Sequence, residues 1–103
     1  MSRETSKINY EPSDIISLDI HTRFHPELSW GQKIFLAEIE EQSKRGRFYY
    51  HKTSLAKFFG VAGVTICYWV KDLNNRGLVE VLFDPNDTIC NTYLVRTSKR
   101  LND

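Results

Sequence analysis

Residues 54–78 read SLAKFFGVAGVTICYWVKDLNNRGL, a stretch that predicts two short helices joined by a tight turn. The first helix is expected from about Thr53 to Phe59, because its apolar residues recur at helical spacing. Gly60 is expected to end it, since glycine enters a left-handed turn at little steric cost. The apolar face of this helix is predicted to be Leu55, Phe58 and Phe59.

The second helix of the stretch is expected from about Val64 to Asn75, after a turn at residues 61–63. Gly77 is expected to close it as a left-handed cap residue. Such a pair predicts a helix-turn-helix, whose second helix enters the major groove of DNA with its N-terminal residues leading. The core-facing residues of this helix are predicted to be Ile66, Trp69, Val70 and Leu73.

Upstream, residues 29–32 have the Ser-x-x-Gln form of a capping box, so a helix is expected from Trp30 to about Lys44. Residues 47–50 are rich in strand formers and predict a short strand. One side of the helix is predicted to be buried, with Phe35, Leu36 and Ile39. The other side is predicted to face solvent, with Glu38, Glu40, Glu41 and Lys44.

Downstream, residues 78–83 and 88–96 predict a hairpin around the turn sequence at residues 84–87, Asp-Pro-Asn-Asp. The short strand at Phe48–Tyr50 is expected to complete a three-stranded sheet. Asp14–His21 has loosely alternating apolar residues and predicts a short strand or an extended segment. The whole pattern predicts an α+β, mainly α fold: a winged helix-turn-helix with three helices and a small antiparallel sheet.

Composition fits one domain, since 41% of the 103 residues are hydrophobic, 13% are aromatic and the net charge is only +1. Residues 14–97 are expected to form that domain, between a flexible arm at 1–13 and a polar tail at 98–103. No segment predicts a membrane span or a signal peptide, so a cytoplasmic location is expected. Cys67 and Cys90 are expected to be free thiols there, with a lone disulfide as the alternative.

Three motifs of the opening stretch resemble the helix-turn-helix domains of phage and plasmid replication proteins and of small bacterial transcriptional regulators. They are Leu55–Val61, Val64–Ile66 and Trp69–Leu78. Residues 27–39 are similar to the first helix of those domains, and the resemblance covers roughly residues 28–94. It implies binding of double-stranded DNA and leaves open a role in transcription or in replication, because both kinds of protein share the fold.

The resemblance also implies which residues contact DNA. Members of the family often carry Ser, Lys, Arg, Asn or Gln on the groove side, whereas this chain has no Arg there for guanine and no Asn or Gln for adenine. Thr65 is expected to bond a base or a phosphate, Val64 to touch a thymine methyl group and Tyr68 to reach a phosphate. The residues placed toward the groove are Gly63, Val64, Thr65, Cys67 and Tyr68, with Lys71 near a phosphate.

Charge is distributed unevenly along the chain. Residues 30–77 carry eight basic and four acidic side chains, a net of +4, while residues 78–95 carry three acidic and no basic ones. Because DNA affinity depends on neutralised phosphates, Asp84 and Asp87 are expected to keep the hairpin from clamping the DNA backbone. Phosphate contacts are expected instead from flanking basic residues, namely Lys52, Arg45 and Arg47.

Two functions remain open from the sequence. The first is a DNA-binding regulator or replication accessory of phage, plasmid or mobile-element type, expected as a homodimer because one such helix makes few base contacts. The alternative is a protein-interaction or dimerisation module of the same fold, because Val64, Cys67 and Tyr68 form an apolar patch suited to a partner.

Neither function is enzymatic, since the sequence holds no nucleophile elbow, phosphate-binding loop or paired-carboxylate motif. No cofactor is expected. His21 and His25 have the four-residue spacing of helical metal ligands, but the segment is predicted to be extended and no cysteine pair or acidic cluster completes a ligand set. No metal site is therefore expected.

Overall fold

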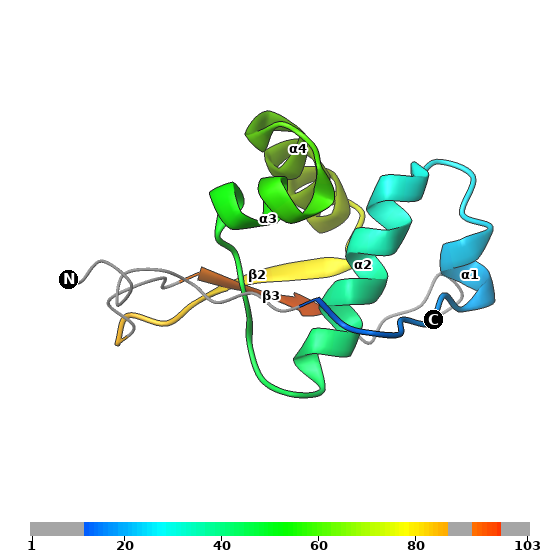
Figure 1. Ribbon diagram of the computed structural model, residues 1–103. Coiled ribbons are helices and arrows are strands. Elements are labelled where there is room, and N and C mark those ends of the chain that lie inside the picture. Colours follow the sequence, from blue (N-terminus) through cyan, green and yellow to red (C-terminus); the bar gives the residue numbers. More distant parts are fainter. Residues whose placement is uncertain (1–11, 87–91, 98–103) are drawn as a thin grey trace.

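The computed structural model describes residues 12–86 and 92–97, and these residues form an α+β fold with four helices and a three-stranded antiparallel sheet. Figure 1 shows α3 and α4 together on one side of the sheet, and α1 on the far side of α2. The elements in chain order are α1 (Ile20–Arg23), α2 (Trp30–Ser43), β1 (Phe48–Tyr49), α3 (Lys52–Phe59), α4 (Gly63–Asn75), β2 (Val79–Phe83) and β3 (Thr92–Arg96).

The predicted three-stranded sheet is confirmed, with β3 in the centre and the order β1-β3-β2. Leu94 of β3 lies opposite Phe48 of β1 on one side and Val81 of β2 on the other. Both Leu94 and Phe48 are buried, because the helices cover this part of the sheet. The expectations for residues 1–11, 87–91 and 98–103, including Asp87 and Cys90, lie outside the described residues.

Three aromatic rings join the helices at the centre of the core. Phe35 of α2 lies 5.4 Å from Phe59 of α3 and 5.6 Å from Trp69 of α4, and the last two rings are 5.8 Å apart, all measured between ring centroids. Edge-to-face and tilted aromatic contacts at this distance add to the hydrophobic gain of burial. The core residues predicted for α2 and α4 are all buried: Phe35, Leu36, Ile39, Ile66, Trp69, Val70 and Leu73.

A three-residue turn separates α3 from α4, and the two helices are bent by 103° at this break. Gly60 has φ of 66°, the left-handed conformation that was expected to end α3. Each helix begins one residue earlier than predicted, α3 at Lys52 and α4 at Gly63. The His51 side chain caps α3 by accepting a hydrogen bond from the Ser54 amide, an unusual cap residue that sequence preference does not anticipate.

Among the described residues, no single helix is long and apolar enough to span a membrane. Only α3 and α4 taken together reach that length and composition, and that pair is the one bent by 103°.

The prediction of a solvated Glu38 is wrong. Its side chain is only 5% exposed. Its Oε2 atom accepts hydrogen bonds from the Ser13 amide over 2.9 Å and from Nε2 of Gln42 over 2.8 Å. The segment before α1 runs over α2 and covers this carboxylate, a long-range contact that helical periodicity cannot reveal. Ser13 therefore packs against α2 and the residues that follow it.

For Asp14–His21 the structure rules out the strand and leaves the extended alternative for residues 14–19, which form neither helix nor strand. Asp19 accepts a hydrogen bond from the Thr22 amide and caps α1, so that the segment ends in a helical turn. The prediction for Phe58 is wrong. Phe58 is 52% exposed although it was placed on the apolar face of α3. Leu55 and Phe59 are one turn apart and point into the core. Phe58 lies at the edge of this buried face, so much of its side chain reaches the surface.

We expect Gly31→Ala to destabilise the fold by about 1–3 kcal/mol, the usual cost of forcing atoms into a packed core. A Cβ atom on Gly31 would lie 2.5 Å from Cζ2 of Trp69, and this ring is held between Phe35 and Phe59. The free energy of unfolding from urea titrations measures the effect.

Gly63→Ala is the matched control for this substitution. A Cβ atom there would meet only the Lys52 stem at an ordinary 3.5 Å, so stability should stay within about 1 kcal/mol of wild type. Equal stability of the Gly31 and Gly63 variants would contradict the tight contact between α2 and Trp69.

Candidate nucleic-acid interface

The outward side of α4 is a stripe of residues spaced by three or four positions, and it lies opposite the buried stripe. Val64 and Tyr68 occupy its N-terminal half, with 75% and 61% of their surface exposed. Lys71 and Asn75 continue it toward the C-terminal end and are also exposed. Positions i, i+4, i+7 and i+11 share one face of a helix, so α4 presents an apolar half followed by a polar half.

The N-terminus of α4 brings together two of the predicted residues, Gly63 and Lys52. The N-cap residue, Ala62, makes no side-chain cap hydrogen bond. The Lys52 stem runs beside Gly63, with its Cδ atom 3.5 Å from where a Cβ atom would stand. A helix N-terminus carries partial positive charge and unsatisfied amides. With a lysine beside it, this end of α4 favours an anionic ligand.

The other residues that the sequence places toward a DNA groove expose less surface. Thr65 and Cys67 are half-buried. The Tyr50 hydroxyl donates a hydrogen bond to Sγ of Cys67 over 3.4 Å. Burial and this hydrogen bond raise the pKa of Tyr50, so the phenol stays neutral. Cys67 is thus hydrogen-bonded to Tyr50, in the loop before α3. The exposed apolar patch on α4 therefore consists of Val64 and Tyr68 only.

The basic corner after α2 is engaged in contacts within the chain. Arg45 donates a hydrogen bond to Oγ of Ser13 over 2.9 Å. Arg47 forms an ion pair with Asp84, and its guanidinium lies 4.5 Å from the ring centroid of Tyr93. The hydrogen bond to Asp84 raises the pKa of Arg47. The positive charge predicted to contact phosphate and the Asp84 charge predicted to repel it therefore neutralise each other, because the Arg47 side chain reaches over Tyr93 of the central strand to Asp84.

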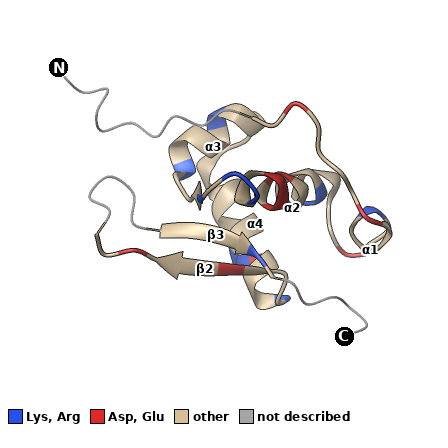
Figure 2. Cartoon of the chain, turned by 90° about the horizontal axis from the view of Figure 1, so that it is seen from below, with Lys and Arg blue, Asp and Glu red and all other residues tan. Residues whose placement is uncertain are grey.

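The stretch from the end of α2 through α3 to Lys71 of α4 carries no acidic side chain. Residues 42–71 contain no Asp or Glu, and α3 shows basic residues only in Figure 2. Lys57 is exposed on α3, as are Lys52 at its start and Lys71 on α4. Positive charge that no neighbouring carboxylate opposes raises the local potential even though the whole chain is nearly neutral.

The first carboxylate after this region, Asp72, is held inside an internal network. It accepts hydrogen bonds from Nε2 of Gln32 over 2.8 Å and from Nε of Arg76 over 2.9 Å, and Arg76 also pairs with Glu27 at 2.5 Å. Burial disfavours the charged carboxylate, but the two hydrogen bonds outweigh it and hold the pKa of Asp72 below its usual value. Arg76 is therefore occupied in joining α4 to the start of α2.

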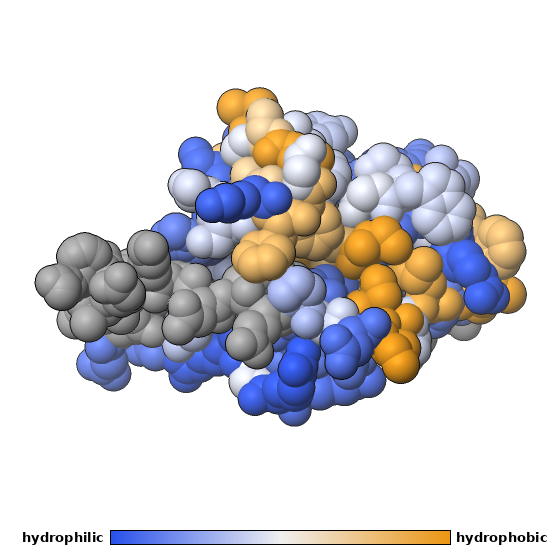
Figure 3. Space-filling model, viewed as in Figure 1, coloured by the Kyte–Doolittle hydropathy of each residue, from blue (hydrophilic) through white to orange (hydrophobic). Residues whose placement is uncertain are grey.

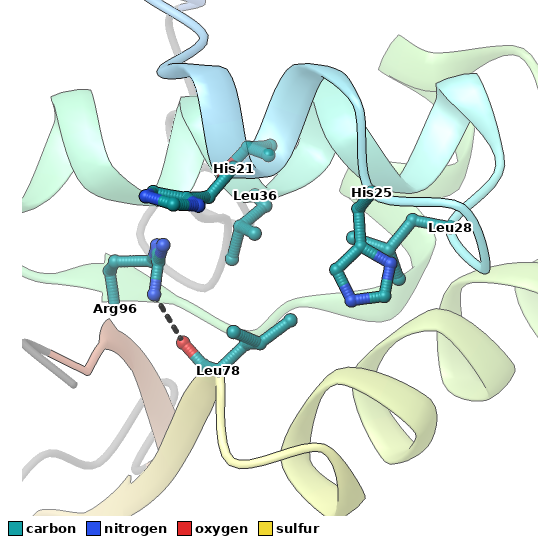
Figure 4. A pocket seen from close by; sticks show the side chains of 7 residues that line it. His21, His25, Leu28, Leu36, Leu78 and Arg96 are labelled. Carbon is teal, nitrogen blue, oxygen red and sulfur yellow. Dashed lines mark hydrogen bonds between the residues drawn. The ribbon is translucent and has the colours of Figure 1, made fainter. Parts of the chain in front are cut away.

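A small hollow beneath α1 lies between His21, His25 and Arg96 (Figure 4). Its volume is about 10 Å³, roughly the space of one water molecule. Burial and the nearby Arg76 lower the pKa of His25, and Arg96 donates a hydrogen bond to the Leu78 carbonyl. Among the described residues no three His, Cys, Asp or Glu side chains group as metal ligands.

No family model, known protein or solved structure matches this chain.

The structure brings Gly63, Lys52, Val64 and Tyr68 into one region, but the pairing of Arg47 with Asp84 was not predicted from the sequence. These two residues are 37 positions apart and lie next to the two outer strands of the sheet, so the Arg47 side chain must reach across β3 to form the pair. The absence of acidic residues between 42 and 71 was a signal that could be read directly from the sequence.

We expect Asp72→Asn to lower stability by about 1–2 kcal/mol at pH 7, the range for a charge-assisted pair that is partly exposed. Because the folded-state pKa of Asp72 is depressed, this stability is present above the unfolded pKa of about 4 and is lost as pH falls through the folded pKa. The difference from wild type should therefore shrink at pH 3. Urea unfolding at both pH values measures it.

Glu80→Gln, on the exposed side of β2, removes a carboxylate outside this network and is the matched control. A deficit of Asp72→Asn that stayed constant between pH 7 and pH 3 would show that the charge of Asp72 contributes nothing to the network.

Proposed function

We propose that the protein binds double-stranded DNA as a winged-helix domain, with α4 as the recognition helix and β2 and β3 as the wing. The observation that carries the proposal is the joint between α3 and α4. Helix-turn-helix motifs join their helices at about 90–120° through a turn of three or four residues that often contains glycine. The 103° bend and the left-handed Gly60 agree with that geometry.

The distribution of charge supports DNA binding by the same face of the molecule, the one formed by α3 and α4. Lys52, beside the N-terminus of α4, and Lys71, on its outward stripe, flank the groove-facing positions, and Lys57 adds a charge on α3. Phosphate contacts supply most non-specific DNA affinity. Arg45 and Arg47 are bound within the chain and contribute less to the proposal than sequence alone suggested.

The proposed role is a small regulator or replication accessory of phage, plasmid or mobile-element type that acts as a homodimer. One helix with few polar groups needs a second copy to bind a site with useful affinity. Apolar residues are exposed before α1, on α1 and its C-cap, and at the first residue of α2, and they are the candidate dimer contact: Ile15, Ile20, Phe24 and Trp30. Sedimentation equilibrium tests this part, and a monomer at all concentrations would remove it.

Fluorescence anisotropy with a labelled mixed-sequence duplex tests DNA binding. We expect binding at low salt, with log affinity falling linearly as log salt rises. Lys52→Gln and Lys71→Gln should each reduce the slope by about 0.9, the value for one phosphate contact.

Lys44→Gln is the control, because it removes the same charge at the C-terminal end of α2, outside α3, α4 and the candidate dimer contact. It should leave the slope unchanged. Absence of binding at low salt, or binding that salt does not weaken, would exclude the proposal.

A second candidate, a protein-interaction module with little DNA binding, is favoured by one observation. Val64 and Tyr68 are exposed at the outer end of α4, where hydrophobic residues reach the surface (Figure 3). Apolar side chains grouped on a surface mark contact sites.

The double variant Val64→Lys/Tyr68→Lys separates the two functions. On a DNA-binding face two added charges should strengthen low-salt binding, whereas on a partner face they should abolish the contact. Phe83→Lys, an exposed apolar residue on β2, is the matched control. Loss of self-association or of partner capture in the α4 double variant, without a gain in low-salt DNA binding and with wild-type behaviour of the control, would favour the second candidate.

A further inference from the structure

The leading two turns of α4 carry exposed apolar side chains in place of hydrogen-bonding ones. Residues 61–70 contain no Arg, Lys, Asn or Gln, the side chains that form paired hydrogen bonds with guanine or adenine. Val64 is 75% exposed and Tyr68 is 61% exposed, while Thr65 is half-buried. If α4 enters the major groove, the surface that meets the base edges is therefore mainly hydrocarbon.

Only one base edge of the major groove is apolar, the C5-methyl group of thymine. We infer that α4 selects sites by their thymine methyl groups, with Val64 as the residue that determines specificity. This inference rests on the proposed function, and it names the feature of DNA that the recognition helix reads.

Spacing on the helix supports two neighbouring contacts. Val64 and Tyr68 are four residues apart, which is about 6 Å along the helix axis at 1.5 Å per residue. Base pairs are stacked about 3.4 Å apart, so the two side chains span roughly two base-pair steps. A short run rich in A·T pairs places methyl groups along this distance. The Tyr68 ring contacts the second position, and its hydroxyl remains oriented for a phosphate or water.

The charged residues next to this apolar surface are suited to contact the phosphates of the DNA backbone rather than the base edges. Lys52 lies beside Gly63 at the start of α4, and Lys71 follows Tyr68 on the outward stripe. Lysine is a compact point charge suited to a phosphate oxygen. The two lysines thus bracket the apolar surface, which lets phosphate contacts place Val64 at the floor of the groove.

Substitution of deoxyuridine for thymidine tests the inference, because uracil keeps every hydrogen-bonding group of thymine and lacks only the methyl. Anisotropy titrations compare an A·T-rich duplex with the same duplex containing deoxyuridine. We expect binding to weaken about fourfold for each thymine methyl group that α4 touches and that uracil lacks, the factor equivalent to about 0.8 kcal/mol for one buried methyl or methylene. A G·C-rich duplex carrying 5-methylcytosine should bind more tightly than its unmethylated form by a similar factor.

Two variants assign the effect. Val64→Ala should discriminate less between the two A·T-rich duplexes than wild type, because its smaller side chain covers less of the thymine methyl group while Tyr68 keeps its own contact. Lys71→Gln should weaken binding to both duplexes by the same factor and leave the preference for thymine over uracil unchanged. Val64 is exposed, so its variant is expected to fold, and thermal unfolding checks this directly.

The outcomes separate the inference from the function on which it rests. Salt-dependent binding that is equal for thymine and uracil would overturn methyl recognition and leave DNA binding in place. No binding to either duplex would overturn both. Discrimination that is undiminished in Val64→Ala would overturn the assignment to Val64. A preference for G·C-rich DNA that disappears in Lys52→Gln would show guanine recognition by that lysine instead.

Discussion

The contact among Phe35, Phe59 and Trp69 is the interaction on which the rest of the structure depends. Each ring comes from a different helix, and the three centroids lie within 5.4–5.8 Å of one another. A helix as short as α3 is marginal by itself, so its position is determined by this packing. Once the Trp69 side of α4 is buried, the opposite side of α4 must face outward. The exposure of Val64 and Tyr68 is thus a consequence of the core.

Electrostatic pairing determines which charges remain at the surface of the α3–α4 region. Asp72 is bound by Gln32 and Arg76, and Asp84 by Arg47. Each ion pair neutralises one carboxylate and one cation, so neither contributes a net charge to the surface around α3 and α4. What the described chain presents around α4 is a set of exposed lysines with an apolar surface between them, although the chain as a whole has a net charge of only +1. Local arrangement, rather than overall charge, therefore decides which ligand this face suits.

Most elements of the fold could be predicted because local signals agree with the packing. The Ser29–Gln32 capping box forms as expected, and the left-handed φ values of Gly60 and Gly77 occur where the helices end. The failures arise where distant segments meet. Glu38 is buried by Ser13, 25 residues away, and helical periodicity has no access to such a contact. The same limit applies to the site, where exposure of α4 was predictable but the engagement of Arg47 in an ion pair was not.

The sequence by itself determined the positions of the helices and strands, the buried stripe of α4 and the apolar character of its outward half, because these depend on residue spacing along one element. Tertiary structure alone decided the 103° joint of α3 and α4, the placement of Lys52 beside Gly63 and the neutralisation of Arg47 by Asp84. Those features arise between elements that are distant in sequence or separated by a turn. Their geometry is set by how the aromatic rings and strands pack, and no local preference encodes it.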